Sequence, residues 1–170
     1  MEAVIAVKEV PTMEMRRKDL AVTDPKALDE MIQRCSCFRL AFADGSHPYI
    51  VPLSFGYAHE GEERTFYFHS AGAGRKVDLC RKLAWAGFEL DNGGRVKPNE
   101  KACDFSVAYE SIIGEEEIQE LTDLKDKAAA LQVIMAHYSG RGDWEMPESV
   151  LKRTCVFRLT VKEISGRTHG

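Results

Sequence analysis

The sequence of 170 residues has no run of about 18 apolar residues, which a membrane-spanning helix would need. Residues 1–10 also lack the basic and then apolar layout of a secretory leader. There is no excess of positive charge, because 23 Lys and Arg stand against 27 Asp and Glu and give a net charge of −4. A membrane and nucleic acid are therefore not expected as partners. We expect a soluble cytoplasmic protein.

Motifs for metal binding and for nucleophilic catalysis are missing as well. The five cysteines are an odd number without a C-x-x-C pair, so their spacing fits neither a disulfide framework nor a zinc site. The histidines form no H-x-x-x-H or H-E-x-x-H spacing, and no G-x-S-x-G elbow is present. We interpret Glu115-Glu116-Glu117 as a solvated strand end or loop rather than a cation site. The sequence thus predicts no metal site.

Internal repeats, low-complexity segments and long linkers are absent too, so a single domain is expected. We assign residues 1–14 to a loosely attached leader and residues 15–170 to that domain. Helical patterns are few. One begins at Asp24-Pro25 and ends near Cys35, a second covers residues 77–84, and the strongest covers residues 124–138 and ends at Gly140.

Alternating apolar and polar residues dominate the rest of the chain and predict strands. Tight turns such as Asp44-Gly45 favour antiparallel pairing. Because proline cannot donate to a strand ladder, Pro52 predicts an edge, a bulge or an opening in the sheet. The predicted fold class is mainly β, an antiparallel sheet of about six strands curled into a barrel, with helices covering its ends. The strands are expected at residues 38–42, 49–57, 65–69, 85–90, 105–120 with a bulge at Gly114, and 156–162.

The segment His69-Ser70-Ala71-Gly72-Ala73-Gly74-Arg75-Lys76 joins the end of a strand to the start of a helix. Its small residues let the backbone approach a ligand closely, and the first amides of a helix attract an anion. With the Ser70 hydroxyl and the charges of Arg75 and Lys76, the segment is a candidate phosphate clamp. It matches neither a Walker A loop nor G-x-G-x-x-G. The alternative is a flexible surface loop followed by a solvated basic helix face.

Four side chains admit both a binding and a packing interpretation. His69 shares a strand face with Tyr67 and is either a packing residue or a ligand contact. Tyr109 and Ser111 lie on one face of their strand and suit a ligand contact as well as packing. Trp144 follows the last long helix and either covers a flat ring or closes the end of the barrel.

Several segments occur in the order found in a known family. They are Met15-Arg16-Arg17-Lys18-Asp19, Pro48 to Tyr57, Phe66 to Ala71, Lys101 to Phe105, and Tyr109 to Gly114. Over roughly residues 15–166 the chain resembles the nitroimidazole-resistance (Nim-like) branch of the pyridoxamine 5′-phosphate oxidase-related flavoproteins. The segment Ile164-Ser165-Gly166-Arg167 ends differently from the pyridoxamine-phosphate oxidases themselves, so oxidation of vitamin B6 is not expected.

The resemblance implies a split β-barrel homodimer that binds FMN at the subunit interface, with each site built from both chains. Val51, Pro52, Leu53 and Ser54 match the family segment that runs along the isoalloxazine ring. Phe68, His69, Ser70, Arg75 and Lys76 match the segment that meets the ribityl phosphate. Tyr109, Glu110 and Ser111 match a strand that the partner subunit presents to the site, and Trp144 is a further candidate contact.

The implied function is an FMN-dependent reductase that takes a hydride from a reduced nicotinamide and passes electrons to a small acceptor such as a nitroaromatic or nitroimidazole. His69 is then a candidate proton donor to the reduced substrate. The alternative is a module that holds FMN or haem for sensing, storage or delivery without turnover. Relatives of this barrel also bind haem or deazaflavin F420, so the fold alone does not select the ligand.

Overall fold

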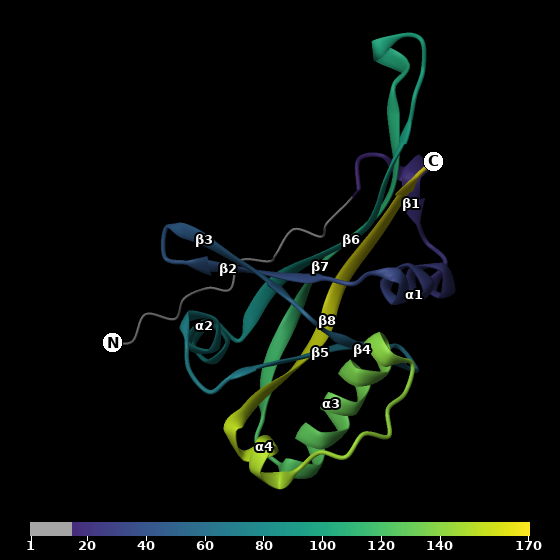
Figure 1. The fold of residues 1–170 in the computed structure, drawn as a ribbon. Coiled ribbons are helices and arrows are strands. Elements are labelled where there is room, and N and C mark those ends of the chain that lie inside the picture. Colours follow the sequence, from purple (N-terminus) through teal and green to yellow (C-terminus); the bar gives the residue numbers. More distant parts are fainter. Residues whose placement is uncertain (1–14) are drawn as a thin grey trace.

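The computed structural model describes residues 15–170, so the expected leader at residues 1–14 lies outside it. One antiparallel sheet of eight strands dominates this part of the chain, in the order β3-β2-β6-β7-β8-β5-β4 and with β1 paired to β8. The sheet curls strongly (Figure 1), and its edge strands β3 and β4 leave the barrel open. The strands are β1 (Ala21–Val22), β2 (Phe38–Asp44), β3 (His47–Leu53), β4 (Gly56–Glu60), β5 (Glu63–Ala71), β6 (Trp85–Lys97), β7 (Ser106–Leu121) and β8 (Thr154–His169). The predicted mainly-β split barrel is confirmed.

Helices surround the sheet, and all three predicted helices are present. They are α1 (Pro25–Arg34), α2 (Arg75–Leu83), α3 (Leu124–Ser139) and α4 (Glu148–Arg153), with short 3-10 turns at η1 (Lys18–Leu20) and η2 (Ala102–Asp104). The predicted start of α1 is also confirmed, because the Asp24 carboxylate caps it by accepting hydrogen bonds from the backbone N–H groups of Lys26 and Ala27. No helix within the described range is long and apolar enough to span a membrane.

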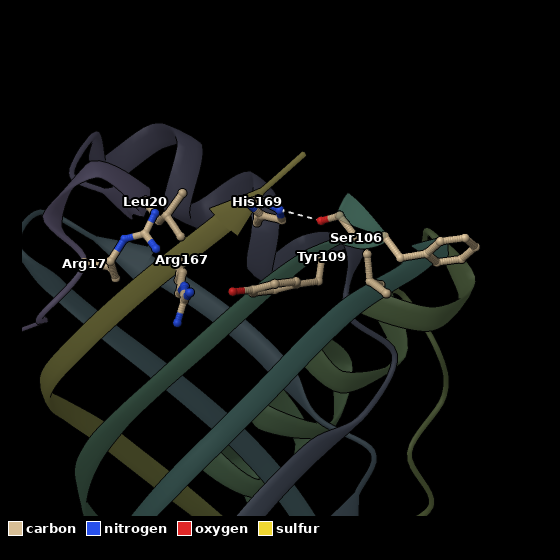
Figure 2. Close-up of a pocket in the computed structure, with 8 residues that line it drawn as sticks. Arg17, Leu20, Ser106, Tyr109, Arg167 and His169 are labelled. Carbon is tan, nitrogen blue, oxygen red and sulfur yellow. Dashed lines mark hydrogen bonds between the residues drawn. The ribbon is translucent and has the colours of Figure 1, made fainter. Parts of the chain in front are cut away.

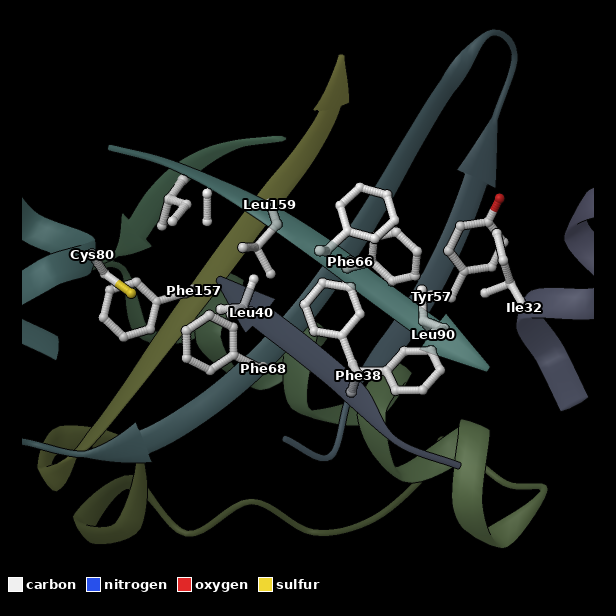
Figure 3. Close-up of a cluster of buried hydrophobic side chains, with 14 of the residues drawn as sticks. Ile32, Phe38, Leu40, Tyr57, Phe66, Phe68, Cys80, Leu90, Phe157 and Leu159 are labelled. Carbon is white, nitrogen blue, oxygen red and sulfur yellow. The ribbon is translucent and has the colours of Figure 1, made fainter. Parts of the chain in front are cut away.

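The barrel interior is filled by side chains from the inward positions of the strands (Figure 3). On β2, Phe38, Leu40 and Phe42 are buried, whereas Arg39 and Ala41 between them are only half-buried. Phe68 of β5 stacks on Phe157 of β8, with ring centroids 4.9 Å apart. Full burial of one such side chain contributes about 1.5–3 kcal/mol. The two-residue period in the sequence therefore determines which side of each strand faces the core.

The expected single strand over residues 49–57 is two strands. It breaks at Ser54-Phe55, because Phe55 turns into the core and is fully buried. Gly56 then begins β4, where a Cβ atom would lie 2.5 Å from the backbone nitrogen of Ile134. Only glycine lets α3 approach β4 this closely. The break places β3 at the edge of the sheet, as Pro52 predicts.

The structure corrects two expectations about β6 and β7. The segment expected as a polar loop at residues 91–101 continues β6 as far as Lys97, and the resulting hairpin projects from one end of the barrel (Figure 1). The predicted bulge at Gly114 of β7 is absent, and the register between β7 and β8 shifts instead between Glu115 and Glu116, where Lys162 of β8 is the extra residue. Glycine is needed at 114 for a different reason, since a Cβ atom there would lie 2.4 Å from the ring of Phe88.

The acidic run at residues 115–117 is not the solvated strand end or loop that the sequence predicts. It lies inside β7, and Glu116 points into the barrel and is fully buried. Neither carboxyl oxygen of Glu116 has a hydrogen-bond partner within residues 15–170. Burial raises the pKa of Glu116 well above its ordinary value, because the charged form loses its hydration. The folded chain therefore favours the protonated form.

Substitution Glu116→Gln is expected to change how stability depends on pH. Since the pKa of Glu116 is higher in the folded chain, folding binds a proton, and this penalty is absent below about pH 4.5 and grows as pH rises toward the folded pKa. In that window the free energy of unfolding of the wild type should fall by about 1.4 kcal/mol per pH unit relative to the variant. Urea titrations between pH 5 and 8 measure this difference. Glu117→Gln, on the exposed side of β7, is the matched control, and equal slopes for Glu116→Gln and wild type would contradict the prediction.

Candidate functional site

The end of β5 and the start of α2 form a basic turn at the open side of the barrel. Gly74 precedes α2 with a φ of 131°, which disfavours other residues, and no side chain of the described residues caps the helix. Residues 71–74 are all exposed. The first backbone N–H groups of α2 therefore face solvent without a partner side chain, which is the arrangement that binds an anion at a helix N-terminus.

Lys76 sits in the first turn of α2 and is partly buried. Its ammonium nitrogen lies 5.8 Å from the ring centroid of Phe68, and no carboxylate in residues 15–170 pairs with it. Burial lowers the pKa of Lys76, because the cation loses hydration and gains no counter-ion. A positive charge of this kind is stabilised when an anion binds beside it.

Arg75, the neighbouring basic residue, already has a partner. Its guanidinium donates to one carboxylate oxygen of Asp44 at 2.7 and 3.0 Å and lies 4.5 Å from the ring centroid of Tyr49. Both partners belong to the β2–β3 hairpin. Arg75 thus fixes the start of α2 against that hairpin. Within this chain its guanidinium is paired with Asp44 and is not free to bind a phosphate.

His69 and Ser70 lie at the end of β5, beside Lys76. The buried neighbours Phe66 and Phe68 confirm that His69 lies on the opposite face of β5, as the alternation predicts. Partial burial lowers the pKa of His69, and the nearby charge of Lys76 lowers it further. The lowered pKa favours the neutral form of the imidazole.

Three of the four residues expected along a flavin ring end the edge strand β3, and the fourth, Ser54, follows it directly. Val51 and Leu53 point inward and pack against the core cluster that also contains Phe68. Pro52 and Ser54 alternate with them and are exposed. Since β3 pairs only with β2, its other edge is free of strand partners among the described residues. Arg75 holds the start of α2 against the turn end of this hairpin, at Asp44 and Tyr49.

Tyr109, Glu110 and Ser111 lie in the N-terminal half of β7. Within one chain they do not contact the basic turn. Glu110 pairs with Arg34 at 2.6 Å and accepts a hydrogen bond from Asn92. Tyr109 lines a separate cavity, where Arg167 and His169 also lie (Figure 2). A joint site with the basic turn requires a second copy of the chain.

Trp144 lies in the loop between α3 and α4 and is 39% exposed. Its indole N–H donates to Ser139 and to the backbone carbonyl of Arg141, and the Arg141 guanidinium lies 4.4 Å from its ring centroid. These contacts hold the α3–α4 loop against the C-terminal end of α3. None of the residues of the basic turn contacts Trp144, so a role beside a cofactor stays a prediction.

The comparison with protein families decides the membership of the chain. A family model described as pyridoxamine 5′-phosphate oxidase matches residues 24–168. The chain belongs to this family. A search of curated proteins finds no match.

Solved structures with the same fold include flavin-related members. A candidate 5-nitroimidazole antibiotic resistance protein from Bacteroides thetaiotaomicron is 21% identical with a TM-score of 0.77, covering 88% of this chain and 86% of that one. A flavocytochrome from Azotobacter vinelandii is 17% identical with a TM-score of 0.77, covering 94% and 73%. An FAD and haem binding protein from Mycobacterium smegmatis is 16% identical with a TM-score of 0.74, covering 88% and 74%. At these identities they show the fold alone.

Sequence reasoning missed some residues of these sites. Asp44 was assigned only to a turn, and its ion pair with Arg75 depends on two elements far apart in the sequence. Arg167 and His169 lie two residues apart on β8, but their neighbours on η1 and β7 do not follow from local patterns. Among residues 15–170, no group of three or more His, Cys, Asp or Glu side chains is arranged to hold a metal.

Substitution Lys76→Met should raise the pKa of His69. The nearby ammonium charge opposes protonation of the imidazole, so its removal favours the charged form, although burial, the larger cause, still holds the pKa below its ordinary value. Titration of the histidine ring protons by NMR measures the shift. Lys82→Met, in the last turn of the same helix, is the matched control and should leave the pKa of His69 unchanged. An unchanged pKa of His69 in Lys76→Met would contradict the claim that the charge of Lys76 acts on His69.

Proposed function

We propose that the chain is an FMN-binding reductase of small acceptors such as nitroaromatics. The observation that carries this proposal is the half-buried ammonium of Lys76, which has no counter-ion in the described residues and lies beside the uncapped first turn of α2. Two kinds of donor lie there, the ammonium and the backbone N–H groups of α2, and the Ser70 hydroxyl at the end of β5 is a third candidate. This combination suits a phosphate group. The flavin and haem ligands of the proteins with the same fold support the same class of ligand.

The residues around the basic turn fit the rest of the cofactor. The free edge of β3 at Val51 to Ser54 offers backbone groups and the exposed Ser54 hydroxyl to a flat polar ring. Phe68, whose ring lies near the Lys76 ammonium, is fully buried and gives the site an apolar inner wall. The ion pair with Asp44 holds Arg75, and with it the start of α2, in place. The phosphate contact therefore falls mainly to Lys76, Ser70 and the helix amides.

Bound FMN would supply the redox chemistry, accepting a hydride from NADH or NADPH and passing electrons to the acceptor. The chain's own residues would bind and orient the ring, exclude water from one side, and move protons. His69 is the candidate proton donor, because it lies at the end of β5 beside Lys76. Since its lowered pKa favours the neutral imidazole, it would act by passing on a proton that it takes up from solvent.

A homodimer completes the proposed site. In the strand register, Pro52 lies level with Arg39, Glu89 and Ile113, so all four share the outer face of the sheet. Tyr109 and Ser111 lie on the same face of β7 as Ile113. The face also exposes Ile50 (61%) and Ile113 (45%). A second copy packed on this face would cover them and bring its own Tyr109, Glu110 and Ser111 toward the cofactor.

Substitution Ile50→Asp should yield a monomer that binds FMN at least tenfold more weakly, since a buried charge opposes association. Sedimentation velocity and FMN titration measure the two effects. Ala129→Asp, on the exposed side of α3, should remain dimeric. A wild type that sediments as a monomer at micromolar concentration would refute the dimer.

Substitution Lys76→Met should weaken FMN binding by on the order of 1.5–3 kcal/mol, the value of a charge-assisted contact to phosphate. Titration followed by flavin fluorescence measures the affinity, and Lys82→Met should bind as the wild type does. Unchanged affinity in Lys76→Met would remove Lys76 from the site.

Turnover is tested on the purified full chain without oxygen. Its absorbance should show the two broad bands of a flavin, and NADH or NADPH should bleach them. Addition of a nitroimidazole should then restore them. Bound flavin that never bleaches would refute the reductase and leave the alternative, a flavin carrier or sensor, whereas a sharp Soret band would identify a haem protein.

A further inference from the structure

A groove lies between α3 and the outer face of the strands β4, β5 and β8, where the helix packs on the sheet (Figure 1). It consists of two adjoining cavities of about 320 and about 170 Å³. The two cavities share four lining residues, which are Ala58, Glu60, Tyr67 and Arg158. No residue of the basic turn lines either cavity, and neither Ile50 nor Ile113 of the proposed dimer face does. We call this space the α3 groove.

Small side chains on both sides keep the α3 groove open. At Gly56 the backbone of α3 comes so close to β4 that a Cβ atom would lie 2.5 Å from the nitrogen of Ile134. One turn or more earlier in the helix, Ala129 and Ala130 line the groove, and Ala58 lines it from β4. Methyl groups leave a space there that larger side chains would fill. The groove therefore follows from the alanines beside the close contact at Gly56.

Arg158 of β8 brings a partly satisfied cation to the groove. It lies opposite Tyr67 in the strand register, and its Nη2 atom forms an ion pair with Glu63. Its Nε atom is buried and has no hydrogen-bond partner within residues 15–170, which is rare for a buried guanidinium N–H group. The side chain as a whole is 37% exposed and lines both cavities. The guanidinium can therefore be reached by an anionic group of a ligand.

Two carboxylates bring negative charge to the same cavity. Glu60 ends β4, Asp126 lies in the first turn of α3, and both residues are exposed. Neither carboxylate forms an ion pair within residues 15–170. The Tyr67 hydroxyl lies among these charges: burial raises the pKa of Tyr67, Arg158 opposes this, and the neighbouring carboxylates add to it. The larger cavity thus presents both signs of charge and an apolar wall.

We propose that the α3 groove binds a small zwitterion, an α-amino acid with an aliphatic side chain. Its carboxylate accepts hydrogen bonds from Arg158 and the Tyr67 hydroxyl, and its ammonium group is held by Glu60 and Asp126. Its side chain packs on the apolar surface of α3. A ligand with charge of only one sign lacks one of these two contacts. The volume of the larger cavity is in the usual range for small-molecule pockets. The groove does not depend on a flavin at α2.

The test is isothermal titration of the full chain with three probes that share one aliphatic group. Leucine carries both charges, isopentylamine lacks the carboxylate, and 4-methylpentanoate lacks the ammonium group. Leucine should bind at least about tenfold more tightly than either analogue, because each charged group adds a charge-assisted contact.

Substitutions on the two sides of the groove should affect different probes. Arg158→Met should weaken leucine binding by about tenfold or more and leave the affinity for isopentylamine unchanged. Asp126→Asn should weaken the binding of leucine and of isopentylamine and leave that of 4-methylpentanoate unchanged. The matched controls are Arg153→Met and Asp143→Asn, at residues that line neither cavity, and both should bind leucine as the wild type does.

A third variant tests the groove without changing a charge. Ala129→Leu, at an exposed position of α3 that lines the larger cavity, should block leucine by filling the space, and it serves if Arg158→Met fails to fold. Wild-type affinity for leucine in both Asp126→Asn and Ala129→Leu would overturn the proposal. Leucine that binds no more tightly than either analogue, or that shows no binding at millimolar concentration, would overturn it as well.

Discussion

The ammonium group of Lys76, which has no counter-ion among residues 15–170, is the feature on which the proposed function depends. Burial lowers the pKa of Lys76, whose ammonium lies near the Phe68 ring. The buried charge destabilises the fold, because no carboxylate among residues 15–170 pairs with it. The neighbouring Arg75 is neutralised by Asp44 and holds α2 against the β2–β3 hairpin. One basic residue therefore positions the turn, and the other remains available to a ligand.

The open sheet explains why a ligand site forms at this position. The break at Ser54-Phe55 sends Phe55 into the core and leaves β3 as an edge strand with free backbone groups. At the other end of the sheet, the long β6–β7 hairpin, the η1 region and the last residues of β8 surround the cavity of Arg167. Both regions flank the outer face that exposes Ile50 and Ile113. A second chain on that face would bring the two regions close together.

The sequence predicts the elements better than the contacts between them. Alternation places Phe38, Leu40 and His69 on the correct faces, and Asp24 marks the start of α1, because these signals are local. The burial of Glu116 is not predicted, since a carboxyl group in a run of three acids gives no local sign of facing the core. The pairs of Arg75 with Asp44 and of Arg167 with Tyr109 join distant segments, which only the folded chain defines. The family resemblance indicates the basic turn, and the geometry separates the roles of Arg75 and Lys76.

The comparison of FMN with riboflavin tests the role of Lys76 most directly, because the two ligands share the ring and ribityl chain and differ only in the phosphate. The wild type should bind FMN at least a hundredfold more tightly than riboflavin, and Lys76→Met should reduce that ratio by at least tenfold, while Lys82→Met keeps it. Equal affinities of the wild type for the two ligands would contradict a phosphate site at the start of α2.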